Sequence, residues 1–128
     1  MDNFKKLYEA ATLAAKHAYT PYSNFQVGAA LESKSGEIYS GGNIENASYS
    51  LTCCAERVTI FKAVSSGVTD FKTFVITSDT KEPISPCGAC RQVMSEFFDE
   101  NVDIILTNNK GNKKVINIHE LLPYSFNL

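Results

Sequence analysis

Apolar residues recur at two different periods along the chain, and the change of period separates a helix from a strand. From Phe4 to Ala18 they follow one helical face, so roughly the first 17 residues are predicted to form an amphipathic helix. From Phe25 the period drops to two, which is typical of a strand, and the opposite face offers only Gly28 and Ala30. Such small residues would let a helix pack closely against this strand.

The remaining pattern predicts a hairpin and then an alternation of helices and strands. Residues 33–37 form a turn into a return strand that begins at Ile38. A helix over about 53–66 ends at Gly67, a strand covers Phe71–Ser78, and a third helix covers about 88–98. A strand from Val102 is followed by a turn at 108–112 and a last strand at 114–118.

These elements predict an α/β fold, a three-layer α/β/α sandwich with a five-stranded mixed sheet. The two links that contain helices are long enough for parallel crossovers. The link at 108–112 is too short for one, so the last two strands should be antiparallel. A chain of 128 residues with 44% apolar residues fits one domain with one core, spanning 1–128.

Composition narrows the class of function. The net charge of −2, with no basic block, argues against nucleic acid as a partner. No apolar run approaches the ~20 residues that span a bilayer, and the first residues lack the apolar core of a signal peptide. We therefore expect a cytoplasmic protein with no membrane partner. In a reducing compartment, its four cysteines are more often metal ligands or catalytic thiols than disulfides.

The spacing of the cysteines points to zinc. Cys87 and Cys90 are separated by two residues, which places both sulfurs on one side of a helix start, where the helix dipole favours thiolates. A zinc half-site is favoured over a redox dithiol or a coincidence. Cys53 and Cys54 are the other possible ligands, but adjacent helical residues point ~100° apart, so one of them is expected to bind. Three cysteines plus a water form an open site, which is typical of catalytic zinc.

Glu56 is then a candidate acid–base group. A carboxylate beside a zinc-bound water can carry its proton without being a ligand. Without the cysteines, Glu56 would be an ordinary acidic residue in a first helical turn. Helical spacing alone does not choose between Cys53 and Cys54. His17 and His119 are expected to be ordinary surface or helix-end histidines.

Cys54-Ala55-Glu56 followed by Pro86-Cys87-Gly88-Ala89-Cys90 resembles the zinc-dependent cytidine deaminases, whose signature of Cys or His, any residue, Glu and later Pro-Cys-x-x-Cys is established. The likeness covers nearly the whole chain, including 43–49 and 87–92. A short chain with three cysteine ligands is similar to the small homotetrameric branch. The resemblance implies one Zn²⁺ per chain on Cys54, Cys87 and Cys90, with Cys53 as a spare.

The resemblance also implies a reaction: hydrolytic deamination of cytidine and 2′-deoxycytidine to uridine and 2′-deoxyuridine plus ammonia, in pyrimidine salvage. Glu56 is implied to take a proton from the zinc-bound water and to return protons to N3 and the leaving amine. Arg57 resembles a family arginine that hydrogen-bonds the ligand sulfurs and draws charge from the metal. Arg91 is a weaker candidate for that role.

For the substrate, the resemblance places Asn43 and Glu45 on the ribose 3′-hydroxyl and Phe25 against the pyrimidine. Ala55 and Tyr49 are further implied contacts. The apolar end of the chain, 121–128, is expected to be buried, either on its own domain or on a neighbouring subunit. The resemblance implies the second, with Phe126 reaching the pocket of the neighbour.

Three other functions are compatible with some of these residues. A deaminase of the same fold could act on another aminopyrimidine, such as a nucleoside antibiotic. A non-catalytic protein could use all four cysteines for a structural zinc, and a thiol oxidoreductase could use the cysteines without metal.

Overall fold

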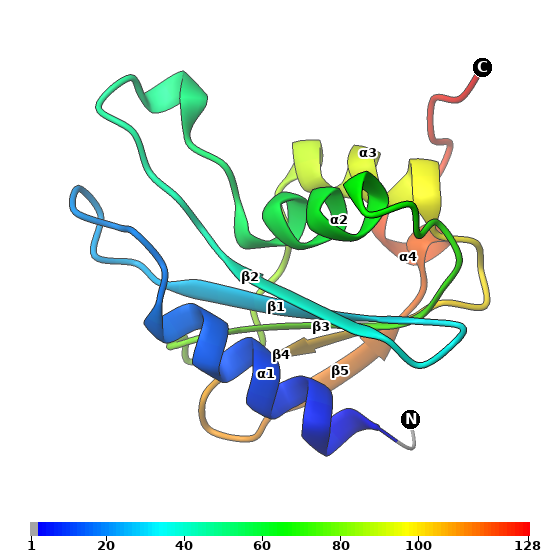
Figure 1. The fold of residues 1–128 in the computed structure, drawn as a ribbon, viewed down its shortest axis with the longest axis horizontal. Helices are drawn as coiled ribbons and strands as arrows, with labels where there is room; N and C mark the ends of the chain where they lie inside the picture. Colours follow the sequence, from blue (N-terminus) through cyan, green and yellow to red (C-terminus); the bar gives the residue numbers. More distant parts are fainter. Residues whose placement is uncertain (1–2) are drawn as a thin grey trace.

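The computed structural model describes residues 3–128, which form three layers with a sheet in the middle (Figure 1). Helix α1 covers one face of the sheet, and α2, α3 and α4 lie over the other. This arrangement confirms the predicted α/β/α sandwich. In chain order, the elements are α1 (Phe4–Lys16), β1 (Val27–Ser33), β2 (Ile38–Gly42), the 3₁₀ turn η1 (Tyr49–Leu51), α2 (Ala55–Ser65), β3 (Phe71–Ser78), α3 (Gly88–Phe97), β4 (Asp103–Thr107), β5 (Lys113–Ile116) and α4 (Ile118–Leu121).

The sheet has the order β2-β1-β3-β4-β5 and mixed strand directions. Strand β1 is antiparallel to both β2 and β3, so β2 and β3 run in the same direction on either side of it. Strand β4 is parallel to β3 and antiparallel to β5. The predicted parallel crossovers through α2 and α3 are therefore confirmed, and so is the antiparallel final pair.

The small residues of β1 allow α1 to lie unusually close to the sheet. A Cβ atom on Gly28 would lie 1.9 Å from the Ala11 carbonyl oxygen and 2.7 Å from the Ala15 nitrogen. Ala30, on the same face of β1, packs with Leu7 and Ala11 of the helix. The close packing of α1 on the face of β1 that carries Gly28 and Ala30 confirms the prediction made from these small residues.

The opposite face of the sheet carries the larger core, and this core fixes α2 and α3. Ala29 and Leu31 of β1 point into it. Fully buried residues of the helices meet them there, among them Ala55 and Ile60 of α2 and Cys90 and Met94 of α3. The N-terminal turns of both helices are thereby held against the sheet.

Helix α2 begins later than predicted and ends where predicted. Its first residue is Ala55, because the backbone of Cys53 pairs with Ile44 through two hydrogen bonds of 2.9 Å. At the other end, Gly67 has a φ of +91°. The hydrogen bonds from Gly67 to Val64 and from Val68 to Ala63 form a Schellman motif, which a glycine accommodates without strain.

Strand β1 also begins later than the predicted Phe25. The side chain of Asn43 accepts a hydrogen bond from the Val27 nitrogen and donates one to the Phe25 carbonyl, each 2.9 Å long. The Asn43 side chain thus bonds backbone groups that a longer β1 would use to pair with a neighbouring strand. Phe25 therefore lies in the loop that precedes β1.

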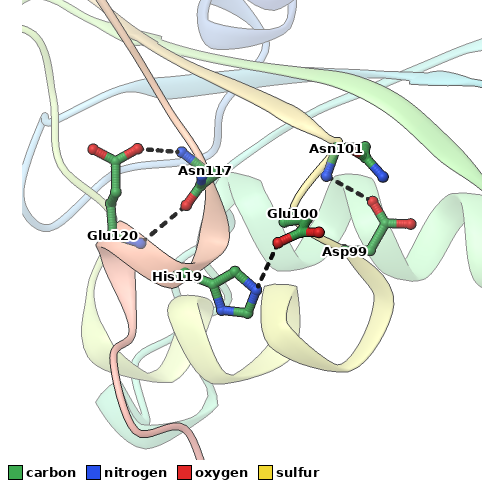
Figure 2. A network of polar contacts seen from close by, with 6 residues as sticks. All are labelled: Asp99, Glu100, Asn101, Asn117, His119 and Glu120. Atoms are coloured by element: carbon green, nitrogen blue, oxygen red, sulfur yellow. Dashed lines mark hydrogen bonds and ion pairs between the residues drawn. The ribbon is translucent and has the colours of Figure 1, made fainter.

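Helix α4 was not predicted, because the last strand was expected to extend to residue 118. The strand ends at Ile116, and Asn117 and Glu120 then form a capping box (Figure 2), with two hydrogen bonds of 3.1 Å. Asn followed three residues later by Glu is a helix-start signal that was present in the sequence. His119 is exposed on this helix, 3.9 Å from Glu100 (Figure 2), as expected of a helix-end histidine.

Within residues 3–128, no helix combines the length and the apolar character that crossing a membrane would require.

The close approach of α1 to β1 makes Gly28 sensitive to substitution. We expect Gly28→Ala to lower the free energy of unfolding by about 3 kcal/mol, the upper end of overpacking costs, because the added methyl would collide with helix backbone. Urea denaturation in excess zinc measures this. Gly88→Ala is the matched control, since no atom beyond its chain neighbours and the backbone of its own helix lies within 4 Å of the added Cβ. Equal stability of the two variants would contradict the close packing.

Candidate active site

Three cysteine sulfurs meet where the N-termini of α2 and α3 converge. Cys54 is the N-cap residue of α2, Cys87 is the N-cap residue of α3, and Cys90 lies in the first turn of α3. The Sγ atoms of Cys54 and Cys87 are 3.9 Å apart, and those of Cys87 and Cys90 are 3.4 Å apart. All three lie within 4.8 Å of one another. The four cysteines of the chain are all free.

This cluster fits one tetrahedral zinc ion. Sulfurs bound at about 2.3 Å from a tetrahedral zinc lie about 3.8 Å from one another, which the observed separations bracket. Neither N-cap side chain caps its own helix, so both sulfurs can bind metal. Two helix N-termini also direct their positive dipole ends at the cluster, which favours thiolates. Three protein ligands leave a fourth position for a water molecule.

Cys53 lies outside the cluster. It precedes the helix in an extended segment, and its backbone is bridged to Ile44. Burial raises the pKa of its thiol. The helical geometry assumed from the sequence does not apply to Cys53, because α2 starts only at Ala55. The structure therefore makes the choice between Cys53 and Cys54 that helical spacing leaves open.

The cluster favours one thiolate at Cys54 in the absence of a metal. The Cys90 thiol lowers the pKa of Cys54 most, and the Arg57 guanidinium, with its Nη2 at 3.4 Å from the sulfur, lowers it further. Together they bring the pKa of Cys54 to about 5, against the effect of partial burial. The pKa of Cys90 is raised, because the Cys54 sulfur and burial both oppose a second negative charge. Arg57 thus contacts a sulfur of the cluster.

Glu56 lies beside the cluster as the second residue of α2. Its side chain is buried, at 5% exposure. Burial, and then the nearby Cys54 sulfur, raise the pKa of its carboxyl group to about 7. A carboxyl group that titrates near neutral pH can accept a proton in one step and donate it in another.

A cavity of about 190 Å³ opens onto Glu56 and two of the sulfurs. Phe25, Asn43 and Ala55, each expected at the substrate, line this cavity. The other lining residues are Val27, Thr52, Cys54, Ile84, Ser85 and Cys87. Val27, Thr52, Ile84 and Ser85 were not anticipated as wall residues, although Thr52 is next to Cys53 and Ser85 is next to Pro86 in the sequence.

Glu45 and Tyr49 line a neighbouring cavity of about 400 Å³, together with Tyr22 and Ser23. Thr52 borders both cavities. The Glu45 carboxylate accepts hydrogen bonds from the backbone nitrogens of Tyr22 and Ser23 and from the Ser23 hydroxyl. The Ser23 hydroxyl contributes most to lowering the pKa of Glu45, which is therefore an ionised acceptor. In the isolated chain, Glu45 thus holds the loop that precedes Phe25.

Two expected residues lie away from the cluster. Phe126 is 70% exposed, and its carbonyl oxygen accepts a hydrogen bond from Gln92, so its ring does not reach the cavity of its own chain. The guanidinium of Arg91 donates to the oxygens of Pro86, Leu121 and Ser85. The expectation that Arg91 supports the sulfurs as Arg57 does is therefore wrong, because its donors are directed at oxygen atoms.

Comparison with known proteins gives one consistent result. Residues 1–106 match the family described as the cytidine and deoxycytidylate deaminase zinc-binding region. The chain is 50% identical to the cytidine deaminase of Sporosarcina psychrophila, over 95% of this chain and 90% of that protein. It is also 50% identical to the cytidine deaminase of Halalkalibacterium halodurans, over 94% and 91%.

A solved structure shares the fold as well. The crystal structure of cytidine deaminase from Burkholderia pseudomallei superposes with a TM-score of 0.93 at 45% sequence identity. The match covers 96% of this chain and 98% of that one.

The position of Cys53 outside the sulfur cluster predicts different zinc contents for two neighbouring variants. Cys54→Ala should lose most of its zinc, because two sulfurs remain of a three-sulfur site. Cys53→Ala is the matched control and should keep one zinc per chain. Elemental analysis of the purified variants measures both, and equal zinc loss in the two would contradict the three-sulfur site.

Proposed function

The chain belongs to the cytidine and deoxycytidylate deaminase family, and we propose from this that it is a zinc-dependent cytidine deaminase. The reaction converts cytidine and 2′-deoxycytidine to uridine and 2′-deoxyuridine with release of ammonia, so the enzyme is a hydrolase of a cyclic amidine C–N bond in pyrimidine salvage. The observation that carries the proposal is a buried carboxyl group, Glu56, beside three clustered sulfurs and a cavity. We further propose that residues 1–128 act as one domain.

Zinc held by Cys54, Cys87 and Cys90, one ion per chain, would supply a Lewis acid that makes a water molecule acidic near neutral pH. Glu56 would accept the two protons of that water in turn, delivering the first to ring N3 and the second to the leaving amino group. Burial of Glu56 serves this role because it keeps bulk water from competing for the proton. The oxygen of the water would thus remain on C4, one of its two protons would end on N3, and the other would leave with the ammonia.

Three thiolate ligands would make it harder for zinc to acidify a bound water molecule. Their charges sum with that of Zn²⁺ to −1, which weakens the metal as an acid. The N-termini of α2 and α3 offset part of this charge. Arg57 would offset more of it, because its Nη2 lies 3.4 Å from the Cys54 sulfur and can draw charge from it.

The substrate contacts follow from the two adjoining cavities. Phe25 would pack against the pyrimidine, and Ala55, at the start of α2, would lie beside the ring. Asn43 and Glu45 would hydrogen-bond the ribose 3′-hydroxyl, using acceptor capacity that remains after their contacts with the backbone. Tyr49, in the neighbouring cavity, would bound the sugar side of the site.

We also propose a homotetramer with shared active sites. A groove of about 460 Å³ beside the edge strand β2 is lined in part by apolar residues, including Leu13 of α1, Val58 of α2 and Ile44, which follows β2. Leu13 is 57% exposed in the isolated chain, and Phe61 and Ile44 are also exposed. Apolar surface of this kind is typical of an interface. The exposed ring of Phe126, on a segment that leaves the body near α3 and α4 (Figure 1), is free to enter a neighbour's site.

The other functions that the sequence left open have less support. A relative described as the blasticidin-S deaminase of Bacillus cereus is 36% identical, against 50% for the cytidine deaminases. A structural site of four cysteines is not favoured, because Cys53 lies outside the cluster. Family membership argues against a thiol oxidoreductase. A cytoplasmic location is part of the proposal, since the ligand thiols must stay reduced to bind metal.

The assignment of Glu56 is tested by Glu56→Gln, which keeps the shape of the side chain but cannot carry a proton. This variant should keep one zinc per chain and lose roughly 10²–10⁴-fold in kcat for cytidine, the usual contribution of a positioned acid–base group. Loss of the ultraviolet absorbance of cytidine measures turnover, and chelated wild-type protein with zinc restored is the control. Near-normal turnover by the variant would remove Glu56 from the mechanism. Inactive but zinc-loaded wild-type protein would contradict the proposed reaction.

The shared site predicts that the last residues are needed for activity. A chain that ends at Pro123 lacks Phe126 and should lose most of its activity, whereas a chain that ends at Phe126 is the matched control and should keep it. Light scattering should give a tetramer for the wild type. A fully active monomer, in either truncated form or in the wild type, would end the idea of shared sites.

A further inference from the structure

We propose that Arg91 is a positioning residue that ties the loop in front of Cys87 to the C-terminal segment, residues 121–128. One side chain would then hold both a zinc ligand and the start of the segment that carries Phe126. This inference rests on the proposed role of Cys87 as a ligand. It gives Arg91 a role distinct from that of Arg57, which contacts a sulfur directly.

The guanidinium of Arg91 uses all three of its nitrogens. Nε donates to the Pro86 carbonyl at 2.9 Å, and Nη2 donates to the Ser85 hydroxyl at 2.8 Å. Nη1 donates to the Leu121 carbonyl at 2.8 Å. Because the guanidinium is a rigid planar fork, contacts on one side of it fix the position of the acceptor on the other side. The loop and the C-terminal segment are thereby placed relative to each other.

The loop depends on this contact. Between β3 and α3, residues 79–87 are held by a hydrogen bond from the Ile84 nitrogen to Thr107 and by one from Asn108 to the Lys81 carbonyl, each 3.0 Å long. After Ile84, the hydrogen bonds that side chains of the described part of the chain make to Ser85 and Pro86 come from Arg91. The next residue is Cys87. Arg91 therefore makes the last side-chain hydrogen bonds to the loop before Cys87, the proposed zinc ligand.

The same loop forms one wall of the cavity. Ile84 and Ser85 line it together with Cys87 and Glu56. A loop that relaxed away from Arg91 would move this wall and would also change the 3.4 Å separation between Cys87 and Cys90. Cys90 would stay in place, because it is fully buried in the core. Loss of Arg91 should thus distort the sulfur cluster at Cys87 while α3 remains folded.

The other partner of Arg91 is the end of α4. This helix has only four residues, and its N-terminus is closed by the capping box of Asn117 and Glu120 (Figure 2). Leu121 is its last residue, and a helix carbonyl at this position lacks a partner within the helix. A cation here also interacts favourably with the helix dipole. Arg91 therefore closes the C-terminal end of α4 and fixes where the following segment starts.

Gln92 adds a second contact to this segment. Its Nε2 donates to the Phe126 carbonyl at 3.1 Å. Two adjacent side chains of α3 therefore hold residues 121–128 at two points, and only Arg91 also holds the loop. The two residues can therefore be distinguished by experiment, because a substitution of Gln92 leaves the contacts to the loop intact.

The experiment compares Arg91→Ala, Arg91→Lys and Gln92→Ala with the wild type in two measurements. The first is the rate of zinc release to a chromogenic chelator, and the second is amide hydrogen exchange over residues 121–128. Arg91→Ala should release zinc roughly 10- to 100-fold faster, as is usual when a residue that supports a ligand is lost, and should exchange faster throughout the segment. Arg91→Lys should be intermediate, because an ammonium cannot reproduce the fork. Gln92→Ala should speed exchange near Phe126 and leave zinc release unchanged.

Ser66→Ala is the matched control for the loss of a hydrogen bond elsewhere. The Ser66 hydroxyl donates a 2.8 Å hydrogen bond to the Lys62 carbonyl at the C-terminal end of α2, the opposite end of that helix from Cys54. This variant should release zinc at the wild-type rate. Equal acceleration in Ser66→Ala and Arg91→Ala, or wild-type zinc release in Arg91→Ala, would overturn the proposal. If Arg91→Ala does not fold, wild-type zinc release in Arg91→Lys overturns it equally. Wild-type protein that binds no zinc would instead contradict the proposed function, and the exchange measurement does not depend on that outcome.

Discussion

The close approach of three sulfurs from two different helices is the constraint on which the rest of this structure depends. When all three sulfurs are thiolates, as zinc ligands are, they repel one another. Separations such as the 3.9 Å from Cys54 to Cys87 and the 3.4 Å from Cys87 to Cys90 then persist only if the parts that carry the sulfurs cannot move apart. The sheet provides this restraint, because α2 and α3 pack against the same face of it. Ala55 and Cys90 are fully buried, so the helix starts cannot separate without opening the core. A divalent cation at the centre would offset the remaining repulsion.

The same restraint gives two neighbouring acids different proton affinities. Cys54 has a lowered pKa because the Cys90 thiol and the Arg57 guanidinium stabilise its charge. Glu56, two residues later, has a raised pKa because it is buried and lies near that charge. The residue at the helix start is thus suited to bind a cation, and the residue inside the helix is suited to exchange a proton. Packing of α2 against the sheet produces both effects, because it fixes which of the two side chains is buried.

The sugar side of the site is organised by polar side chains that first satisfy the backbone. Asn43 bonds the main chain on both sides of Gln26, and Glu45 bonds the main chain at Tyr22 and Ser23. These contacts hold the loop that carries Phe25, which lines the cavity. A nucleoside hydroxyl that binds Asn43 and Glu45 would therefore meet acceptors that are already oriented. An amide and a carboxylate at this position serve the fold as well as the proposed recognition of the substrate.

The sequence by itself determined the layers of the fold and the identity of the chemical groups. Periodicity is a local property, so it revealed the helices, the strands and the face of β1 that receives α1. Motif spacing, with the resemblance it carries, indicated zinc, Cys54, Cys87, Cys90 and Glu56. Local signals were also present for α4, whose capping box at Asn117 and Glu120 was overlooked.

Only the tertiary structure decided questions that depend on contacts between distant segments. The physical reason that Cys54 and not Cys53 joins the cluster is where α2 begins, and this is set by the pairing of Cys53 with Ile44, nine residues earlier in the chain. The role of Arg91 depends on the Leu121 carbonyl, which lies 30 residues away along the chain. The raised pKa of Glu56 depends on burial, which spacing does not report. Propensity and spacing act over a few residues, whereas burial and long-range hydrogen bonds exist only once the chain has folded.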